Sequence, residues 1–253
     1  MKFLALIPAR YASTRFPAKP LAMLDDKPIV QHVYERVVKA FDDVYVVTDD
    51  MRIYDAVMAF GGRCLMTSVH HKSGTDRCCE ALESLEAEHQ HYDVVVNIQG
   101  DEPFISLSQL DAIKTCFNDE QAQIATLIKP FTPTDGIEAL ENPNSPKVVI
   151  DNQMNAMYFS RSVIPYLRGV ERENWLEKHV FYKHIGLYAY RTEVLKQITQ
   201  IPYGQLEAAE SLEQLRWLQA GYVIKTAVTE EETIGIDTPE DLEKAKAYLK
   251  KNL

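Results

Sequence analysis

Apolar residues in the first part of the chain form short continuous runs that alternate with segments of helical periodicity. The runs lie at residues 3–8, 44–47, 63–66 and 94–98, and the periodic segments lie at 28–41, 51–60 and from 73 or 75 to about 88. Continuous runs of this length predict buried strands, and helical periodicity predicts amphipathic helices. Because strands that alternate with helices form right-handed crossovers, this half of the chain predicts a parallel sheet.

The second half of the chain is less regular. Strands are predicted at 124–131, 147–151, 155–160, 184–190 and 222–228, with one amphipathic helix at 205–220 and a closing helix at 238–249. We therefore expect an α/β fold in which a mixed, mainly parallel sheet is flanked by helices and carries a smaller lobe. Ligands of such sheets bind beyond the carboxyl ends of the strands, which here are residues 8–10, 48–50 and 99–101.

Composition and charge narrow the class of protein. The chain has 253 residues, of which 46% are hydrophobic and 25% charged, as in ordinary globular proteins. Its net charge of -10 disfavours a general binder of nucleic acids or membrane surfaces, which are polyanions. Residues 1–24 nevertheless contain four cations and no acid. This basic segment indicates either a local anion site or a chance cluster of solvated charges.

The cysteines and the N-terminus bear on the cellular compartment. Cys64, Cys78, Cys79 and Cys116 have no zinc-like spacing, so we expect reduced thiols in or near the core. The first apolar run is too short for a signal peptide, and no later run reaches the length of a membrane span. A cytoplasmic protein is the expectation. Two pairs of histidines lack further ligands at metal-binding spacing and are interpreted as solvated surface. They are His70 with His71, and His89 with His91.

The loop that follows the first strand is the strongest candidate for chemistry. Walker, dinucleotide-binding and zinc-protease motifs are absent from the sequence. Residues 8–21, however, place the cations Arg10, Arg15 and Lys19 beside the hydroxyls of Ser13 and Thr14. So many donors at a strand's carboxyl end suit a triphosphate. The alternative is a basic loop that pairs with acids elsewhere in the chain.

Two acidic positions are candidates for a metal site. Asp101 follows the strand at 94–98, where a carboxylate is well placed to hold Mg²⁺. Asp237 precedes Thr238-Pro239-Glu240, which has the pattern of a helix start. Asp237 or Thr238 could therefore cap the closing helix, and this simpler role stays open for Asp237.

Seven motifs in this order resemble the 3-deoxy-manno-octulosonate cytidylyltransferases, also called CMP-Kdo synthetases. They span nearly the whole chain: IPARYASTRFPAKPL at 7–21, SGTDR at 73–77, NIQGDEP at 97–103, YFSR at 158–161, HIGLY at 184–188, LEQLR at 212–216 and DTPED at 237–241. One departure is visible, because the family usually has glycine where this chain has Ala18. If that position needs a positive φ, alanine is strained there.

The resemblance implies a nucleotide-diphospho-sugar transferase fold and the Mg²⁺-dependent reaction of CTP with 3-deoxy-D-manno-octulosonate (Kdo), which gives CMP-Kdo and diphosphate for lipopolysaccharide biosynthesis. It also implies a homodimer. On the matching positions it implies catalytic roles for Arg10, Lys19, Asp101 and Asp237, with the two aspartates as metal ligands. It implies CTP contacts for Pro8, Ala9, Arg10, Ser13, Lys19, Ser73, Gly74, Thr75, Asp76 and Arg77. It implies sugar contacts for Arg15, Gln99, Arg161, His184, Tyr188, Glu213 and Gln214.

This interpretation divides a single nucleotidyltransferase domain into two parts. Residues of about 1–125 and 222–253 would form the nucleotide-binding core, and about 126–221 the sugar-binding and dimerisation part. Two alternatives remain. One is the same reaction on 8-amino-Kdo or another acid sugar, since one substituent changes few contacts. The other is a non-catalytic nucleotide-binding subunit, which the joint presence of Arg10, Lys19, Asp101 and Asp237 disfavours.

Overall fold

The computed structural model describes residues 1–12, 16–232 and 235–251. The chain divides into two compact units, one formed by residues 1–110, 190–199 and 233–253 and the other by 111–189 and 200–232. Residues 111–125 and 222–232, which the sequence-based division assigns to the nucleotide-binding core, therefore belong to the second unit, and 190–199 belong to the first.

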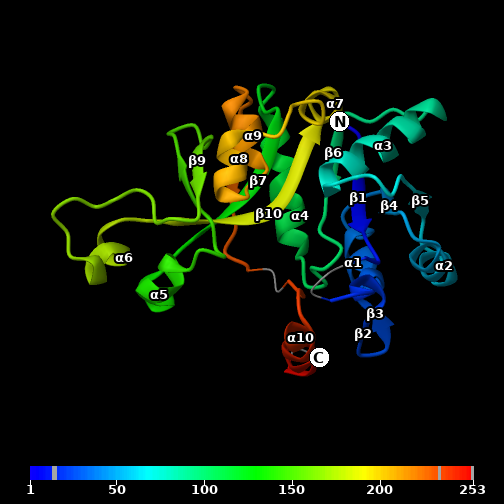
Figure 1. Cartoon of the computed structure of the whole chain (residues 1–253), viewed down its shortest axis with the longest axis horizontal. Helices are drawn as coiled ribbons and strands as arrows, with labels where there is room; N and C mark the ends of the chain where they lie inside the picture. The colour runs from blue at the N-terminus through cyan, green and yellow to red at the C-terminus, as the bar shows by residue number, and fades with distance from the viewer. Residues whose placement is uncertain (13–15, 233–234, 252–253) are drawn as a thin grey trace. The chain divides into compact units, whose positions relative to one another are not determined.

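The first unit is built on parallel strands (Figure 1). Strand β1 (Phe3–Ala9) lies between β4 (Asp43–Thr48) and β6 (Val94–Asn97), and β5 (Cys64–Met66) pairs with β4. The helices of this unit are α1 (Ile29–Val37), α2 (Met51–Ala59), α3 (Gly74–Ala87), α7 (Thr192–Ile198) and α10 (Pro239–Lys251), and β2 (Met23–Leu24) and β3 (Lys27–Pro28) form a short hairpin. The predicted parallel sheet is confirmed here.

The second unit contains both parallel and antiparallel pairs. Its strands are β7 (Ile124–Pro130), β8 (Lys147–Ile150), β9 (Ala156–Ser160), β11 (Ile224–Val228) and most of β10 (Tyr182–Arg191). Strands β11 and β7 are parallel, whereas β8 runs antiparallel to β9 and to β10. Its helices are α5 (Gly136–Glu141), α6 (Trp175–Lys178), α8 (Gln205–Glu210) and α9 (Gln214–Gln219), and α4 (Leu107–Thr115) crosses the boundary between the units in sequence. The mixed, mainly parallel sheet flanked by helices is therefore confirmed.

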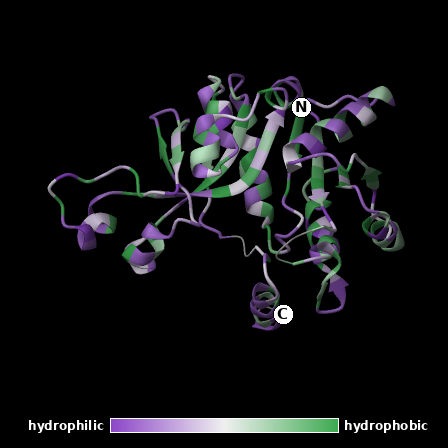
Figure 2. Cartoon of the chain, viewed as in Figure 1, coloured by the Kyte–Doolittle hydropathy of each residue, from purple (hydrophilic) through white to green (hydrophobic). Residues whose placement is uncertain are grey.

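Burial explains why the strands read as continuous apolar runs. Val94, Val95 and Val96 are all fully buried, as are Leu4 and Leu6 in the neighbouring strand. Strands covered on both faces have no polar face, so their sequences do not alternate. Figure 2 shows the contrast between hydrophobic β1 and the mostly hydrophilic helix α10. No helix in the described parts of the chain is long and apolar enough to span a membrane.

Two local predictions are wrong. The single helix expected at 205–220 is two helices, α8 and α9, because Ser211 adopts a left-handed conformation with φ 51° and ψ 47°. The helix expected at 28–41 is shorter, because α1 ends at Val37 and Val38 is its exposed C-cap residue. The four cysteines are free thiols, and three of them are buried.

Candidate functional site

A cavity of about 220 Å³ lies in the first unit at the carboxyl ends of β1 and β6. This is the sheet edge at which the sequence predicts a ligand. Its lining includes most residues expected to contact CTP, one expected to contact the sugar, and both expected metal ligands. These are Pro8, Ala9, Arg10, Lys19, Ser73, Gly74, Arg77, Gln99, Asp101 and Asp237, and the remaining wall is formed by Ala12, Pro20 and Gly100.

The loop after β1 folds back on itself and returns Lys19 to this cavity. The Ala18 N–H donates to the Tyr11 carbonyl at 2.9 Å, and a 3₁₀ turn at Lys19–Leu21 follows directly. Ala18 has φ 59° and ψ 18°, so the position does require a left-handed backbone. Arg10 is exposed at the cavity. The predictions for Ser13 and Arg15 lie outside the described residues.

Replacing Ala18 by glycine is expected to stabilise the fold. The left-handed conformation costs an L-residue ~1–2 kcal/mol, whereas the extra backbone entropy of glycine costs less, ~0.5–1 kcal/mol. The free energy of unfolding should rise by up to ~1 kcal/mol, measured by urea denaturation. Ala87→Gly, at the exposed end of α3, is the control and should lower the same quantity. A lower value for Ala18→Gly would show that the loop does not need this conformation.

Lys19 joins the two predicted metal ligands. Its Nζ lies 2.5 Å from Asp101 Oδ2 and 3.0 Å from Asp237 Oδ1, although the aspartates are far apart in sequence. The Asp101 carbonyl also accepts the Ile236 N–H at 2.9 Å, which fixes the segment that precedes Asp237. Burial opposes the charged ammonium, but the two carboxylates outweigh it and raise the pKa of Lys19. Lys19 is therefore a cation held between two anions at the cavity.

Asp237 does not supply the helix cap. The cap of α10 is a reciprocal pair in which Asp241 N donates to Thr238 Oγ1 at 3.2 Å and Thr238 N donates to Asp241 Oδ2 at 3.2 Å. These hydrogen bonds use Thr238 and Asp241 as a capping box does. The Asp237 carboxylate points instead to Lys19. The simpler role considered for Asp237 is therefore filled by its neighbours.

The donor set at this point fits a hard divalent cation. Two carboxylates converge within reach of one positive charge, and Mg²⁺ is held in proteins by one or two carboxylates together with substrate phosphates. Among the described residues no group of three or more histidine, cysteine or acidic side chains gathers as a metal site. The pair Asp101 and Asp237 is thus a partial ligand set of the kind that nucleotide phosphates complete.

The N-terminus of α3 forms one wall of the cavity. Ser73 caps this helix by accepting the Asp76 N–H at 3.1 Å, and Asp76 accepts the Ser73 N–H in return at 3.3 Å. The side chain of Asp76 is therefore used within the protein, and Thr75 is buried. Gly100 also lines the cavity, and a Cβ at this position would lie 2.6 Å from the Pro8 carbonyl oxygen. Only glycine allows the two chain segments to approach this closely.

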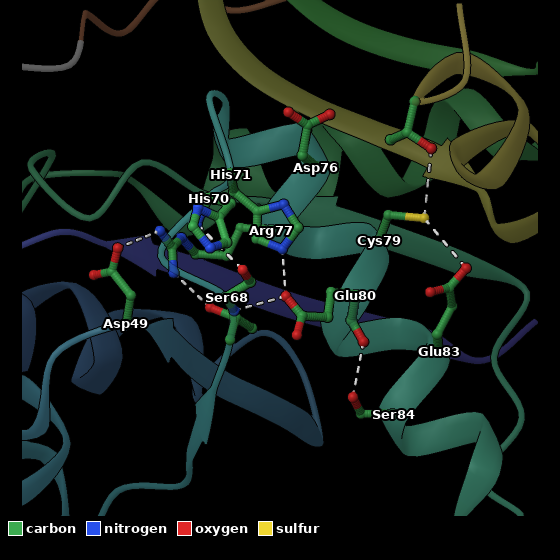
Figure 3. Close-up of polar contacts among 12 residues, drawn as sticks. Asp49, Ser68, His70, His71, Asp76, Arg77, Cys79, Glu80, Glu83 and Ser84 are labelled. Atoms are coloured by element: carbon green, nitrogen blue, oxygen red, sulfur yellow. Dashed lines mark hydrogen bonds and ion pairs between the residues drawn. The ribbon is translucent and has the colours of Figure 1, made fainter.

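Arg77, which lines the cavity, is held in place by polar contacts with its neighbours (Figure 3). This side chain is 1% exposed, and its Nη2 donates to Asp49 Oδ2 at 2.9 Å while Nη1 donates to Thr67 Oγ1 at 2.5 Å. One helical turn later, Glu80 accepts the Ser68 N–H and pairs with His71 Nε2. The sequence predicted a solvated histidine at position 71. His71 instead pairs with Glu80 and anchors the chain before Ser73.

Arg161, in the second unit, is held by main-chain carbonyls. Its Nε, Nη1 and Nη2 donate to the carbonyls of Glu210, Pro143 and Ser211 at 2.6, 2.9 and 3.2 Å. A guanidinium has five N–H donors, and within the described residues three of them are used, so two remain. Both are on the terminal nitrogens, the geometry that a carboxylate accepts. The side chain also lines a larger cavity of about 990 Å³ in this unit.

His184 and Tyr188 lie on the same side of β10. The His184 imidazole packs against Phe159 and Tyr188, with ring centroids 5.1 and 5.3 Å apart. Its Nε2 lies 3.0 Å from Thr126 Oγ1, whose own proton is directed to main-chain carbonyls. Nε2 therefore donates to Thr126, and Nδ1 is left as an acceptor. Tyr188 packs edge-on against Trp217 of α9, and Glu213 and Gln214 begin that helix.

Burial lowers the pKa of His184 to about 3. Because the imidazole titrates near 6.5 in the unfolded chain, the unfolded state binds the proton more tightly. The contribution to stability is complete above pH 6.5 and is lost as the pH falls toward 3. The melting temperature should therefore fall on acidification from pH 7 to 5, and it should fall less for His184→Gln. The exposed His91, replaced in the same way, is the control and should follow the wild type.

Several residues at these sites were not found from the sequence. Asp49 and Thr67 hold Arg77, and Glu210 holds Arg161. Asp49 does lie at a predicted strand end, and that position was a usable signal. Nothing in the local pattern marks Glu210, because Arg161 lies 49 positions away, and Thr67 stands ten positions before Arg77, outside the motif at 73–77.

Comparisons with known proteins agree with this geometry. Residues 4–247 match the family model for Cytidylyltransferase. The chain is 66% identical to a 3-deoxy-manno-octulosonate cytidylyltransferase of Phocaeicola vulgatus (99% of this chain, 98% of that protein) and 51% identical to one of Porphyromonas gingivalis (98% and 96%). A solved CMP:2-keto-3-deoxy-manno-octonic acid synthetase complexed with CTP is similar over the full length of both chains, with 40% identity and a TM-score of 0.89. The chain therefore belongs to the family of 3-deoxy-manno-octulosonate cytidylyltransferases.

Proposed function

We propose that this chain transfers the cytidylyl group of CTP to Kdo and releases diphosphate. The observation that carries the proposal is the convergence of Lys19, Asp101 and Asp237 in a cavity also lined by Arg10 and by the start of α3. This arrangement can neutralise a triphosphate at the carboxyl edge of a parallel sheet. The relatives named 3-deoxy-manno-octulosonate cytidylyltransferase match this chain over almost its whole length and theirs.

In the proposed reaction a sugar hydroxyl attacks the α-phosphorus of CTP as the bond to diphosphate breaks. Such a transfer needs positioning and charge neutralisation more than covalent help. Arg10 and Lys19 neutralise the phosphate oxygens. An ammonium has three N–H donors, and within the described residues two of those of Lys19 go to the aspartates, which leaves one for a phosphate oxygen.

Asp101 and Asp237 would hold Mg²⁺. A bound magnesium ion polarises the phosphate and stabilises the charge that develops in the transfer. The aspartates bind the ion through anionic oxygens and keep Lys19 in place beside the triphosphate. Residues Ser73–Arg77 are proposed to bind the cytidine, with Arg77 held in position by Asp49 and Thr67.

Gln99 and Arg161 are proposed to contact the sugar acid. The two remaining N–H groups on the terminal nitrogens of Arg161 suit its carboxylate. Nδ1 of His184 can accept a hydrogen bond from a sugar hydroxyl. The further sugar contacts carried by this proposal are Arg15, Tyr188, Glu213 and Gln214.

The test is diphosphate release measured with CTP and Kdo, CTP alone, UTP and Kdo, and CTP and 8-amino-Kdo. We expect release only when nucleotide and sugar are both present. CTP should be preferred to UTP, because a site that pairs with the N4 amine of cytosine leaves a group unpaired against uracil. If neither Kdo nor 8-amino-Kdo supports diphosphate release, the chain is a non-catalytic nucleotide-binding subunit. If 8-amino-Kdo is preferred to Kdo, it is the substrate.

We further propose a cytoplasmic homodimer that supplies CMP-Kdo for lipopolysaccharide synthesis. Free cysteines fit a reducing compartment. Tyr166, Val180 and Met157 of the second unit are large apolar side chains that are 76%, 52% and 64% exposed, and a second copy of the chain could cover them. Light scattering of the purified protein would measure the oligomeric state.

A further inference from the structure

The corner between α8 and α9 leads directly into two residues proposed to bind the sugar acid. Ser211 breaks the helix with its left-handed conformation, and Glu213 and Gln214 follow as the first residues of α9. A non-glycine residue in this region is strained unless its surroundings hold it there. The direction in which α9 starts therefore depends on what fixes the corner.

The corner is fixed by the end of β9 through four hydrogen bonds. The Glu210 carboxylate accepts Ser160 Oγ–H at 2.7 Å and the Arg161 N–H at 2.9 Å. In return, Arg161 Nε donates to the Glu210 carbonyl at 2.6 Å and Nη2 donates to the Ser211 carbonyl at 3.2 Å. Ser160 Oγ also accepts the Ser162 N–H at 3.0 Å. Glu210 and Ser211 thus connect the corner to one strand end.

Glu210 is also the negative charge near two cations. Lys147 lies opposite Ser160 in the β8–β9 pair, is fully buried, and donates to the Asn142 carbonyl at 3.0 Å. Burial lowers the pKa of Lys147, Arg161 lowers it further, and Glu210 acts in the opposite sense. A neutral side chain at 210 would therefore leave Lys147 and Arg161 without this compensating charge.

Gln214, the first residue of α9, has a buried side-chain donor for which the described residues supply no acceptor. The residue is 4% exposed, and within the described residues its side-chain Nε2 has no hydrogen-bond partner. A buried donor without a partner is costly, so such a donor implies an acceptor that a ligand supplies. Carboxylate and hydroxyl oxygens of a sugar acid are acceptors of this kind.

We propose that Glu210 is a positioning residue of the sugar-acid site: by holding the α8–α9 corner against Ser160 and Arg161, it places Glu213 and Gln214 for the substrate. This inference rests on the proposed function. Glu210 acts through its neighbours and makes no contact with the reacting atoms. Its removal should weaken the use of the sugar while leaving the CTP cavity of the other unit intact.

The experiment is steady-state kinetics of Glu210→Gln, which keeps the shape of the side chain and removes its charge. We expect the KM for Kdo to rise about tenfold, the size of effect that loss of charged hydrogen bonds produces, with the KM for CTP unchanged. The control is Asp151→Asn. Asp151 lies at the other end of the β8–β9 hairpin, and its carboxylate likewise accepts main-chain N–H groups, from Gln153 and Asn155. This variant should lose thermal stability without a change in the KM for Kdo.

A second variant covers the case in which Glu210→Gln does not fold. Ser160→Ala removes one of the two donors to the carboxylate and should raise the KM for Kdo in the same direction by less. An unchanged KM for Kdo in a folded variant would overturn the positioning role. Equal increases in both KM values, or an increase in the Asp151→Asn control, would show a merely structural effect and overturn it too. A wild-type enzyme inactive with Kdo would instead overturn the proposed function.

Discussion

Lys19→Ala is expected to reduce kcat/KM for CTP by ~100-fold or more, because it removes a fixed positive charge from the site of the transferring phosphates. The loss should be larger than that of a simple surface charge, since Lys19 also separates Asp101 from Asp237. Without the ammonium these carboxylates repel each other and the triphosphate. The measurement is diphosphate release at varied CTP concentration.

Lys2→Ala is the matched control for this variant. Lys2 belongs to the same basic segment of residues 1–24, but its side chain is 54% exposed and pairs with Asp43, away from the cavity lining. Its replacement removes the same charge from the same unit and should leave kcat/KM for CTP within about twofold, as surface pairs contribute little. Wild-type kinetics for Lys19→Ala would show that the loop is only a basic surface feature.

The pH dependence of stability provides a second check on Lys19. Burial opposes its charged form, but Asp101 and Asp237 raise its pKa above the ordinary value of 10.5. A raised pKa stabilises the fold fully below the unfolded pKa, and this contribution is lost as the pH rises through the folded value. The difference in melting temperature between the wild type and Lys19→Ala should therefore stay constant from pH 7 to 9. A difference that disappears within this range would contradict the ion pairs.

Local signals account for most of the correct predictions. The strand predicted at 94–98 and the helix predicted to begin at 73 or 75 depend on residues that are adjacent in sequence, and both are found in the structure as β6 and α3. The meeting of Asp101 and Asp237 could also be expected from chemistry and topology, because each follows a strand-like segment or turn. Lys19, which joins them, was predicted as a ligand of phosphate, and pairing of its loop with distant acids was left as the alternative.

The features that sequence reasoning missed depend on distant partners. The segment 205–220 has the apolar spacing of one helix, yet it breaks at Ser211 because Arg161, about fifty positions earlier in the chain, binds the Glu210 and Ser211 carbonyls. Arg77 was likewise interpreted from its motif, whereas its position is set by Asp49 and Thr67. Tertiary hydrogen bonds of this kind override a helical pattern, and no local window contains them.

Asp101→Asn and Asp237→Asn are each expected to cut kcat by ~100-fold or more and to raise the Mg²⁺ concentration needed for activity. Asparagine keeps the size of the side chain but removes the anionic oxygen that a hard cation prefers. Because the two carboxylates act on one centre, the double variant should be little worse than the worse single variant. The measurement is a Mg²⁺ titration of activity beside a melting curve for each protein.

Asp241→Asn separates metal binding from helix capping. This substitution removes the same charge four positions further along and disrupts the reciprocal pair with Thr238. It should lower stability by ~1 kcal/mol, the usual cost of a lost cap, and leave the Mg²⁺ titration unchanged. Asp237→Asn should instead raise the Mg²⁺ concentration needed for activity and leave the helix cap intact, because the Asp237 carboxylate binds Lys19 and not the helix start. If Asp237→Asn instead melts earlier and keeps a normal Mg²⁺ response, Asp237 is a structural residue and Asp101 must hold the ion with other ligands.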